Sequence, residues 1–346
     1  MNWTRREMLV GCAGAVPALV SVASLIGRSA EPERKTLGVI SHSYSLRRFT
    51  DPVLLLEYCR ELGAAGVQIA IGARDEGYTA RLRRELDRQQ MYLEGSISLP
   101  RDHADTARFE AEVRTAKQCG ATILRTVMLQ GRRYEVFNTA EDFRQFADRS
   151  WQSLQLAKPI IERHEMRLAI ENHKDWRTEE LLDLLRRAAS PFIGVCIDTG
   201  NSIALLEDPM AVVEAYAPWA FSTHLKDMGV EEYADGFLLA EVPLGTGFLD
   251  LPKIIGVIRR AHPEVHLNLE MMTRDPLKIP CLTPKYWATF ANLSGRHLAD
   301  TLHMVRTHAG KEPLPRISGL SREDKLKRED ENVRRCLSYA RERLAL

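Results

Sequence analysis

The sequence predicts an α/β protein, a (β/α)8 TIM barrel with a helical extension at its C-terminal end. Eight short apolar segments alternate with longer amphipathic segments between residue 36 and about residue 310. Short, almost continuously apolar segments are typical of parallel strands that helices cover on the outside. The span is also close to the roughly 250 residues of such a barrel. A doubly wound open sheet is the alternative, but no GxGxxG motif follows the first apolar segment.

Each expected element follows from its own segment. Strands are expected in TLGVIS (36–41), GVQIAI (66–71), MYLEGSIS (91–98), ATILRTVML (121–129), MRLAIEN (166–172), FIGVCID (192–198), FSTHLK (221–226) and VHLNLEMM (265–272). Helical patterns are clearest at 51–63, 140–164 and 178–190. The stretch 229–247 is an insertion after the seventh strand. Residues 286–310 are expected to hold the eighth helix, and 321–346 a further helix that caps the barrel.

Composition describes an ordinary globular protein and gives little reason to expect a polyanionic partner. The chain has 346 residues, 45% hydrophobic and 27% charged, with a formal net charge of +1. Such a balance offers no broad positive field, so we expect no nucleic-acid partner. Six cysteines are scattered without CxxC spacing, which favours separate buried thiols over a disulfide frame or a zinc knot.

The N-terminal residues read as a targeting segment. Arg5 and Arg6 stand just before an apolar stretch, MLVGCAGAVPALVSVASLIG, and the pattern resembles a twin-arginine export signal. We therefore assign 1–30 to a signal peptide and expect export by the twin-arginine machinery to a periplasmic or other extracytoplasmic location. An uncleaved membrane anchor is the alternative. The barrel is assigned to 31–310 and the helical extension to 311–346, whose helix could also serve a homo-oligomer interface.

Four strand ends carry the strongest functional signal. The fifth to eighth strands finish at Glu171, Asp198, His224 and Glu270, and in a barrel all four side chains lie at the carboxyl mouth. Three carboxylates and one imidazole suit Mn²⁺, Mg²⁺ or Co²⁺, with Zn²⁺ as a further candidate. Each residue alone has an ordinary alternative, such as a structural histidine or a helix-capping aspartate. The four together favour a metal site.

Four further polar residues are candidates for binding the substrate. His42 follows the first strand and His173 follows the fifth, and each could equally be a polar residue at the top of the barrel. Asn201 could orient a ligand or cap the next segment. Lys226 could offset negative charge that develops on the substrate, or pair with its neighbour Asp227.

The motifs IENH, IDTGN, HLKD and NLE resemble the xylose isomerase-like TIM barrels. That family includes sugar and sugar-phosphate isomerases and epimerases, inosose dehydratases and apurinic endonucleases. Over Thr36 to Thr307, the resemblance implies that the four strand-end residues hold one divalent metal. It also implies that Glu171 and Glu270 face each other across the substrate as acid and base. The endonucleases have a zinc-binding histidine three residues after the aspartate; Asn201 stands there, so a three-metal phosphodiesterase site is not expected.

The constellation then predicts a chemistry. We expect a divalent-metal-dependent sugar isomerase or epimerase, which removes a proton next to a carbonyl group and passes through an enediolate. A metal-dependent lyase is the first alternative, eliminating a leaving group from a 3-oxo-glycoside or an inosose-type substrate, and an exported location favours it. A sugar-binding protein without turnover is the second. In each case the expected ligand is a small carbohydrate.

Overall fold

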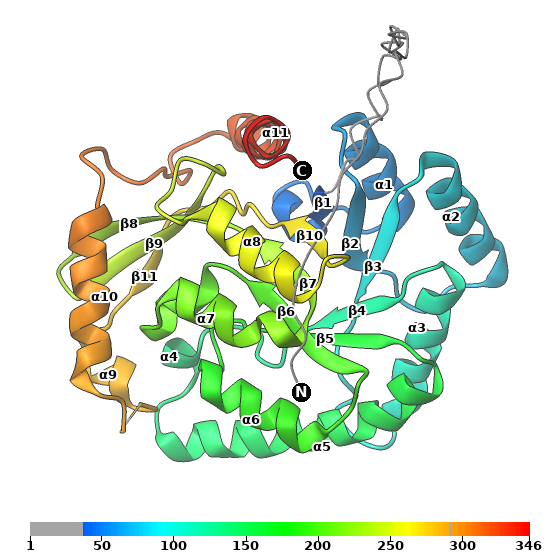
Figure 1. Ribbon diagram of the computed structural model, residues 1–346, viewed down its shortest axis with the longest axis horizontal. Helices are drawn as coiled ribbons and strands as arrows, with labels where there is room; N and C mark the ends of the chain where they lie inside the picture. Colours follow the sequence, from blue (N-terminus) through cyan, green and yellow to red (C-terminus); the bar gives the residue numbers. More distant parts are fainter. Residues whose placement is uncertain (1–36, 291) are drawn as a thin grey trace, which may run out of the picture. The chain divides into compact units, whose positions relative to one another are not determined.

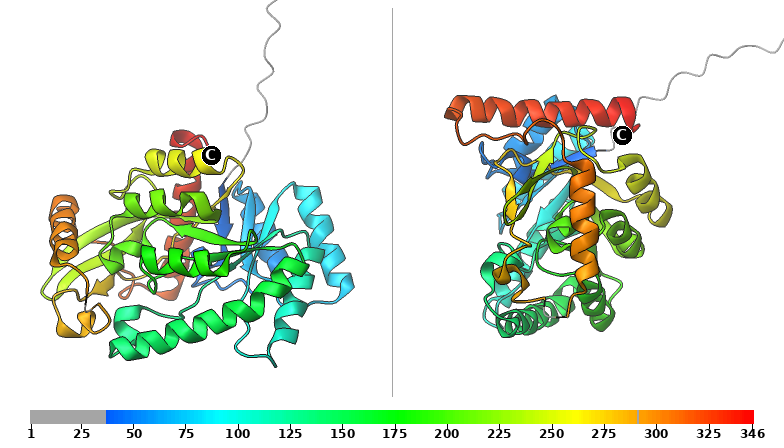
Figure 2. Two further views of the ribbon diagram at one scale, coloured as in Figure 1. Left: turned by 60° about the horizontal axis from the view of Figure 1, so that its bottom comes forward. Right: turned by 90° about the vertical axis from the view of Figure 1, so that its left-hand side faces the viewer.

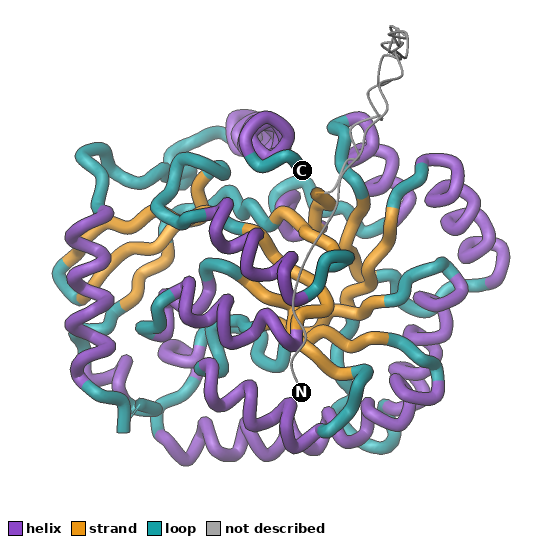
Figure 3. Tube along the Cα trace, in the orientation of Figure 1, coloured by secondary structure: helices purple, strands orange, loops and turns teal. Residues whose placement is uncertain are grey.

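The computed structural model describes residues 37–290 and 292–346, and this part of the chain contains the predicted barrel. Eight parallel strands close in the order β1-β10-β7-β6-β5-β4-β3-β2, around the centre of Figures 1 and 3. The strands are β1 (Leu37–Ile40), β2 (Gly66–Ala70), β3 (Tyr92–Ser96), β4 (Ile123–Thr126), β5 (Arg167–Glu171), β6 (Ile193–Asp198), β7 (Ala220–Leu225) and β10 (His266–Leu269). Seven lie within the segments expected from the sequence and β7 begins one residue before its segment, which confirms the fold.

Helices surround the barrel and return the chain from one strand to the next. They are α1 (Pro52–Glu61), α2 (Glu76–Gln89), α3 (Thr106–Gln118), α4 (Arg133–Val136), α5 (Ala140–Arg163), α6 (Thr178–Ala188), α7 (Pro209–Tyr216) and α8 (Leu251–Ala261). Short 3₁₀ turns are η1 (Ser41–Tyr44), η2 (Asn201–Leu205) and η3 (Ala217–Trp219). The start of α1 shows the local cause: the Asp51 carboxylate accepts from the Val53 amide, and Pro52 has no amide to leave unpaired.

The insertion after the seventh strand forms a small antiparallel sheet together with a short strand that follows β10. Its strands are β8 (Asp227–Tyr233), β9 (Gly236–Val242) and β11 (Leu277–Ile279), in the order β11-β9-β8. Helices α9 (Pro284–Trp287) and α10 (Gly295–His308) lie over it, at the left of Figure 1. Val230, Leu239 and Val305 are among the residues that pack between the sheet and these helices. This second core extends the wall of the barrel mouth on the side of β7.

The last two helices, α10 and α11, cover different parts of the protein from those that we expected. The segment 286–310 was expected to complete the ring, but the buried Val305 of α10 packs on the small sheet. The final helix, α11 (Arg322–Arg343), instead contributes Val333, Cys336 and Leu337 to the main core of the barrel. Figures 1 and 2 show it beside α8 and α1, where the eighth helix of the ring belongs. Because α10 covers the apolar face of the small sheet, the eighth position of the outer helical ring is left for α11.

Some expectations concern residues at the N-terminus. The proposed signal, residues 1–30, lies outside the described residues. Within 37–290 and 292–346, no helix is both long enough and apolar enough to cross a membrane. The five cysteines of this part are free and buried, as their spacing predicted.

Candidate metal centre

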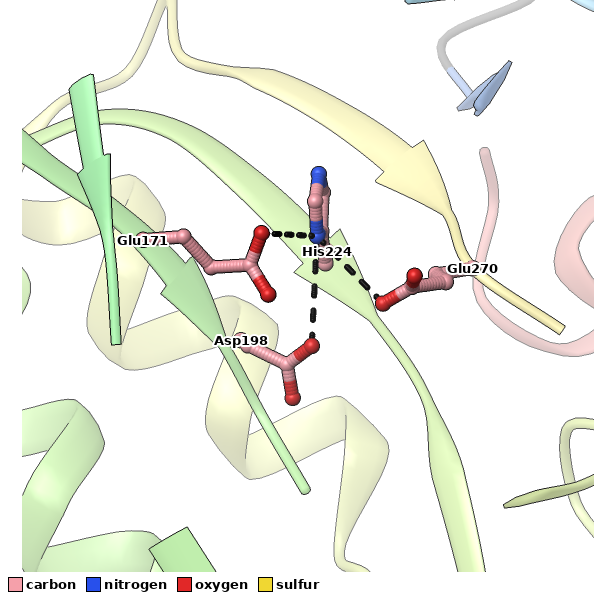
Figure 4. A group of neighbouring side chains, drawn as sticks. All are labelled: Glu171, Asp198, His224 and Glu270. Atoms are coloured by element: carbon pink, nitrogen blue, oxygen red, sulfur yellow. Dashed lines mark ion pairs between the residues drawn. The ribbon is translucent and has the colours of Figure 1, made fainter. Parts of the chain in front are cut away.

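The structure brings the four predicted strand-end residues together in one buried cluster. Figure 4 shows Glu171, Asp198 and Glu270 around the imidazole of His224, each from a different strand end. One ligand atom from each residue lies within 4.8 Å of all the others. His224 Nδ1 is 3.4 Å from Glu171 Oε2, 3.4 Å from Glu270 Oε2 and 3.9 Å from Asp198 Oδ2. We call these four residues the metal centre.

Several atoms of the metal centre are buried without a hydrogen bond. Among the described residues, His224 Nδ1, Asp198 Oδ2 and Glu270 Oε2 have no hydrogen-bond partner. Buried polar atoms in proteins are nearly always hydrogen-bonded, so a convergent group of unpaired ones indicates a ligand. Their chemistry, carboxylate oxygens with one imidazole nitrogen, matches a divalent cation. The residues present therefore fit the metal that the resemblance implies.

The imidazole of His224 is oriented from inside the barrel. Glu94 accepts from Gln68 Nε2 at 2.8 Å, which turns Gln68 Oε1 toward His224 Nε2, also at 2.8 Å. Because an amide oxygen only accepts, His224 carries its proton on Nε2 and leaves the Nδ1 lone pair for a metal. The same carboxylate of Glu94 binds Ser222 Oγ at 2.6 Å, His266 Nδ1 at 2.8 Å and Asn268 Nδ2 at 3.1 Å. We call Glu94, Ser222, His266 and Asn268 the interior cluster.

Asp198 is positioned by the end of the neighbouring strand. The Asn172 carboxamide accepts from the Asp198 amide at 2.7 Å and donates to the Asp198 carbonyl at 2.9 Å. The amides of Gly200 and Asn201 donate to Asp198 Oδ1 at 2.9 and 2.8 Å. These bonds satisfy one carboxylate oxygen and leave Oδ2 facing the centre. Asn172 therefore has a positioning role, which explains a polar residue directly after β5.

Glu171 is held far more firmly than Glu270. Arg125, on β4, donates to Glu171 Oε2 through Nε at 2.6 Å and also through its terminal nitrogen. Asn201 Nδ2 donates to the other oxygen, Oε1, at 3.1 Å. The carboxylate of Glu270 instead lies beside Lys226, whose Nζ is 2.7 Å from Oε2 without hydrogen-bond geometry. The two glutamates are thus chemically unequal.

The electrostatics of the metal centre favour a bound cation. Burial would lower the pKa of His224, but Cys196, Glu171 and Glu270 raise it well above its usual value. Burial raises the pKa of Asp198 to about 6, against the effect of Lys226. Burial would likewise raise the pKa values of both glutamates, yet Arg125 beside Glu171 and Lys226 beside Glu270 keep them well below the usual range.

Buried charges continue beyond the four ligands. Lys226 Nζ also lies 2.9 Å from Asp198 Oδ2, 3.3 Å from Asn201 Oδ1 and 3.5 Å from Glu241 Oε1. Arg274 pairs with both oxygens of Glu241, at 2.7 and 3.2 Å. The salt bridge between Lys226 and Asp227 that the sequence offered as an alternative is absent, because the Lys226 ammonium turns to these other partners.

The Asp227 carboxylate has a different use. It accepts from the backbone amides of Gly245 and Gly247, both at 2.9 Å, and so ties the loop after β9 to β8. Gly245 has φ +80°, and a Cβ at Gly247 would lie 2.1 Å from Asp227 Oδ1, so both positions need glycine. Since an internal carboxylate occupies these amides, the loop is a structural turn.

The two remaining predicted residues lie around the metal centre. His173 follows Glu171, and its buried Nδ1 has no hydrogen-bond partner among the described residues. Burial lowers its pKa to about 3, so the imidazole is neutral. His42 lies in η1 and is exposed. It lies at the rim, while Asn201 and Lys226 lie within the cluster.

Sequence reasoning missed residues that matter to the site. Arg125 and Glu94 stand inside segments predicted as buried strands, and Gln68 lies 156 residues from His224. The only available signal was a polar residue in the middle of an apolar run, as in ATILRTVML and MYLEGSIS. Glu241 belongs to the inserted sheet, whose strands were not predicted.

The fold and the site define a class: a parallel α/β barrel with a candidate divalent-metal site at its carboxyl mouth. Residues 56–288 match the family model described as xylose isomerase-like TIM barrel, and this chain belongs to that family. The match covers the barrel from α1 to α9. It confirms the family that the strand-end motifs resembled.

Individual proteins extend the comparison. The chain is 27% identical over 207 residues to a 3-oxo-isoapionate decarboxylase of Pectobacterium atrosepticum, covering 59% of this chain and 72% of that protein. A crystal structure of D-psicose 3-epimerase with D-fructose superposes with a TM-score of 0.59 at 14% identity, over 90% of this chain and all of the other. A xylose isomerase-like protein of Mycobacterium smegmatis in complex with magnesium gives 0.51 at 15% identity, over 77% and 97%. The structural similarities, at such low identity, show the fold alone.

Proposed function

We propose that the protein is a divalent-metal-dependent isomerase or epimerase of a small polyhydroxy carbonyl compound. The observation that carries the proposal is the convergence of ligand atoms from two glutamates, one aspartate and one histidine, of which those on Asp198, His224 and Glu270 have no hydrogen-bond partner among the described residues. Glu171, Asp198, His224 and Glu270 would hold Mn²⁺, Mg²⁺ or Co²⁺, with Zn²⁺ as a further candidate. When bound, such an ion stabilises the negative charge of an enediolate as a Lewis acid.

The glutamates supply the proton transfers. Glu171 is the last residue of β5 and Glu270 directly follows β10, and Figure 4 shows them on opposite sides of His224. That placement suits one carboxylate removing a proton from carbon and the other returning one. Glu270 is the better proton carrier because its carboxylate accepts no hydrogen bond from the described residues, whereas Arg125 and Asn201 occupy both oxygens of Glu171. Lys226, beside Glu270, offsets the negative charge that develops on the substrate.

A lyase is the second candidate, and two observations favour it. The curated relative is named a decarboxylase. In addition, because Arg125 binds the carboxylate of Glu171, Glu270 is left as the one of the two glutamates that can accept and donate protons. A lyase needs only one such residue. In decarboxylation, the electron pair of the broken C–C bond stays on the substrate carbon next to the carbonyl group, CO₂ leaves, and a proton adds to that carbon. In β-elimination, the carboxylate removes a proton and the leaving group departs with its bond pair.

Proton exchange tests both candidates. The full chain is loaded with Mn²⁺ for activity or Mg²⁺ for spectroscopy, incubated in D₂O with ketoses and 3-oxo-glycosides, and followed by NMR. Deuterium entering a C–H bond next to an intact carbonyl group supports the isomerase or epimerase. An unsaturated ketone with a released alcohol, or loss of CO₂ from an oxo acid, supports the lyase.

Matched variants connect the result with the site. Glu270→Gln keeps the shape of the side chain and removes the proton-carrying group, so deuterium incorporation should stop. Glu264→Gln alters an exposed glutamate just before β10 and should exchange like the parent. If the protein converts no substrate, whichever metal is loaded, the proposal of an enzyme is wrong and the alternative of a sugar-binding protein is favoured.

Export remains a separate proposal based on Arg5 and Arg6. A protein exported while folded can acquire its metal before leaving the cytoplasm, which suits a buried metal centre. Fractionation of a bacterial host should find the protein outside the cytoplasm. Replacing both arginines by lysine should retain it inside, and unchanged export would contradict the twin-arginine route.

A further inference from the structure

One buried cation beside the metal centre lacks an anionic partner. Lys174 is 3% exposed, and its Nζ donates to the neutral Asn201 Oδ1. Among residues 37–290 and 292–346, no carboxylate oxygen lies within the 4.0 Å of an ion pair from this nitrogen. A buried ammonium without a counter-charge is costly to the fold. Burial and the charge of Lys226 accordingly lower the pKa of Lys174 to about 8.

Asn201 joins Lys174 to a second lysine. Its Oδ1 accepts from Lys174 and, at 3.3 Å, from Lys226. Lys226 is itself close to Asp198 Oδ2 and Glu270 Oε2, two of the atoms that a metal would use. A divalent ion at the metal centre would therefore compete with Lys226 for these oxygens. With the ion bound, Lys174 would still lack a carboxylate, and Lys226 would keep only Glu241, at 3.5 Å.

The charge balance points to a missing anion. The network of charges around the metal centre, Lys226 and Glu241 contains the cations Arg125, Lys174, Lys226 and the partly exposed Arg274, and the buried anions Glu171, Asp198, Glu241 and Glu270. These formal charges cancel before any ion binds. A divalent ion adds two positive charges, and an unbalanced charge in a buried site is unfavourable. A neutral sugar brings no compensating charge of its own, whereas a carboxylate does.

We propose that Lys174 and Lys226, joined through the Asn201 carboxamide, bind a carboxylate of the substrate, so that the substrate is a polyhydroxy acid carrying a carbonyl group. This inference rests on the proposed function and specifies its substrate class. It assigns Lys174 to substrate binding and gives Lys226 a second role. It also explains why the fold keeps an ammonium in a place where a neutral side chain would be cheaper in free energy.

Two matched pairs of sugars test the proposal by calorimetry on the Mg²⁺-loaded full chain. 2-Keto-D-gluconate differs from D-fructose, and 5-keto-D-gluconate from L-sorbose, by a carboxylate in place of a hydroxymethyl group. At least one acid should bind about tenfold or more tightly than its neutral match, the effect of one charge-assisted hydrogen bond. Lys174→Met should abolish that preference, and Lys174→Arg should retain it. Lys278→Met alters an exposed lysine on β11, is the matched control and should behave like the parent.

The ligand-free protein gives a second readout. Because Lys174 is buried without an ion-pair partner among the described residues, Lys174→Met should raise Tm when no ligand is present, whereas a purely structural lysine would lower it. Equal binding of acid and neutral sugar, failure of both acids to bind, or a preference that survives in Lys174→Met would overturn the proposal. Binding is measured without turnover, so a metal-loaded protein that binds the acid but exchanges no deuterium would contradict the proton-transfer function and leave this subsite standing.

Discussion

Two buried polar clusters lie one layer apart in the barrel, and they differ in how completely their hydrogen bonds are made. In the interior cluster, Glu94 accepts from four side chains, and His266 also stacks on Tyr92 at 3.8 Å between ring centroids. In the metal centre, three ligand atoms have no hydrogen-bond partner among the described residues. Strand β7 carries Ser222 of the interior cluster and His224 of the metal centre, and Glu270 of the metal centre directly follows β10, which carries His266 and Asn268.

The difference separates a structural role from a ligand-binding role. A buried polar cluster whose bonds are satisfied stabilises and specifies the fold. One with convergent unpaired atoms stores unfavourable free energy that a bound ion can relieve. Changes to the metal centre should therefore affect binding and activity more than stability. Changes to the interior cluster should do the reverse.

The largest expected effect is on catalysis. Glu270→Gln should lower the rate of proton exchange by about 100- to 10,000-fold, the range for loss of a general acid or base. Its Tm should stay close to that of the parent, because Lys226 keeps Asp198 and Glu241 beside it when the Glu270 charge is removed. Proton NMR in D₂O measures the rate, and a thermal melt measures Tm. If Glu270→Gln lowered both Tm and activity, Glu270 would have a structural role, which would contradict this prediction.

The next effect is on stability. Glu94→Ala leaves the side chains of Gln68, Ser222 and Asn268 without their acceptor and should lower the free energy of unfolding by about 3 to 5 kcal/mol. Urea denaturation measures the loss. Glu94→Gln keeps one acceptor oxygen and should lose less. A fully stable Glu94→Ala protein would mean that the interior cluster contributes little to the fold.

Gln68 connects the two clusters, and its replacement should have an intermediate effect. Gln68→Leu removes the acceptor that orients His224 and should weaken metal binding about 10- to 100-fold, as loss of such outer partners does. Calorimetric titration with Mn²⁺ measures the affinity. Gln89→Leu, on the outer helix α2, is the control. If Gln68→Leu bound Mn²⁺ with unchanged affinity, the hydrogen bond to Gln68 would not be needed to orient His224.

The smallest effect is a pH dependence from Lys174. Its pKa of about 8 lies below its value in the unfolded chain, and it faces Lys226, Arg274, Glu241 and Asp198. Between pH 8 and the ordinary lysine value, the unfolded chain binds more protons, so stability should rise with pH in that window. Affinity for an oxo acid should fall over the same range because the ammonium is lost. Lys174→Met should remove both trends, and trends that persisted in it would assign them to another group.

The metal centre was predictable from the sequence because it depends on local rules. Apolar strands ending in Glu171, Asp198 and Glu270 need only the barrel topology to bring their ends together. Arg125, Glu94 and Gln68 were hidden because they stand within strands, where the closed barrel alone shows which residues face each other. The position of Lys174 depends on the Asn201 turn, and that of α10 on the inserted sheet. These long-range arrangements leave no periodic signal in the chain.

The central claim is that the metal centre binds one divalent ion, and a Mn²⁺ titration followed by electron paramagnetic resonance tests it most directly. We predict one bound ion per chain for the parent and for Glu94→Gln, provided that the variant is folded. Asp198→Asn, which keeps the shape but removes a ligand charge, should lose that ion. The absence of a bound ion in the parent, or equal binding by Asp198→Asn, would contradict the account.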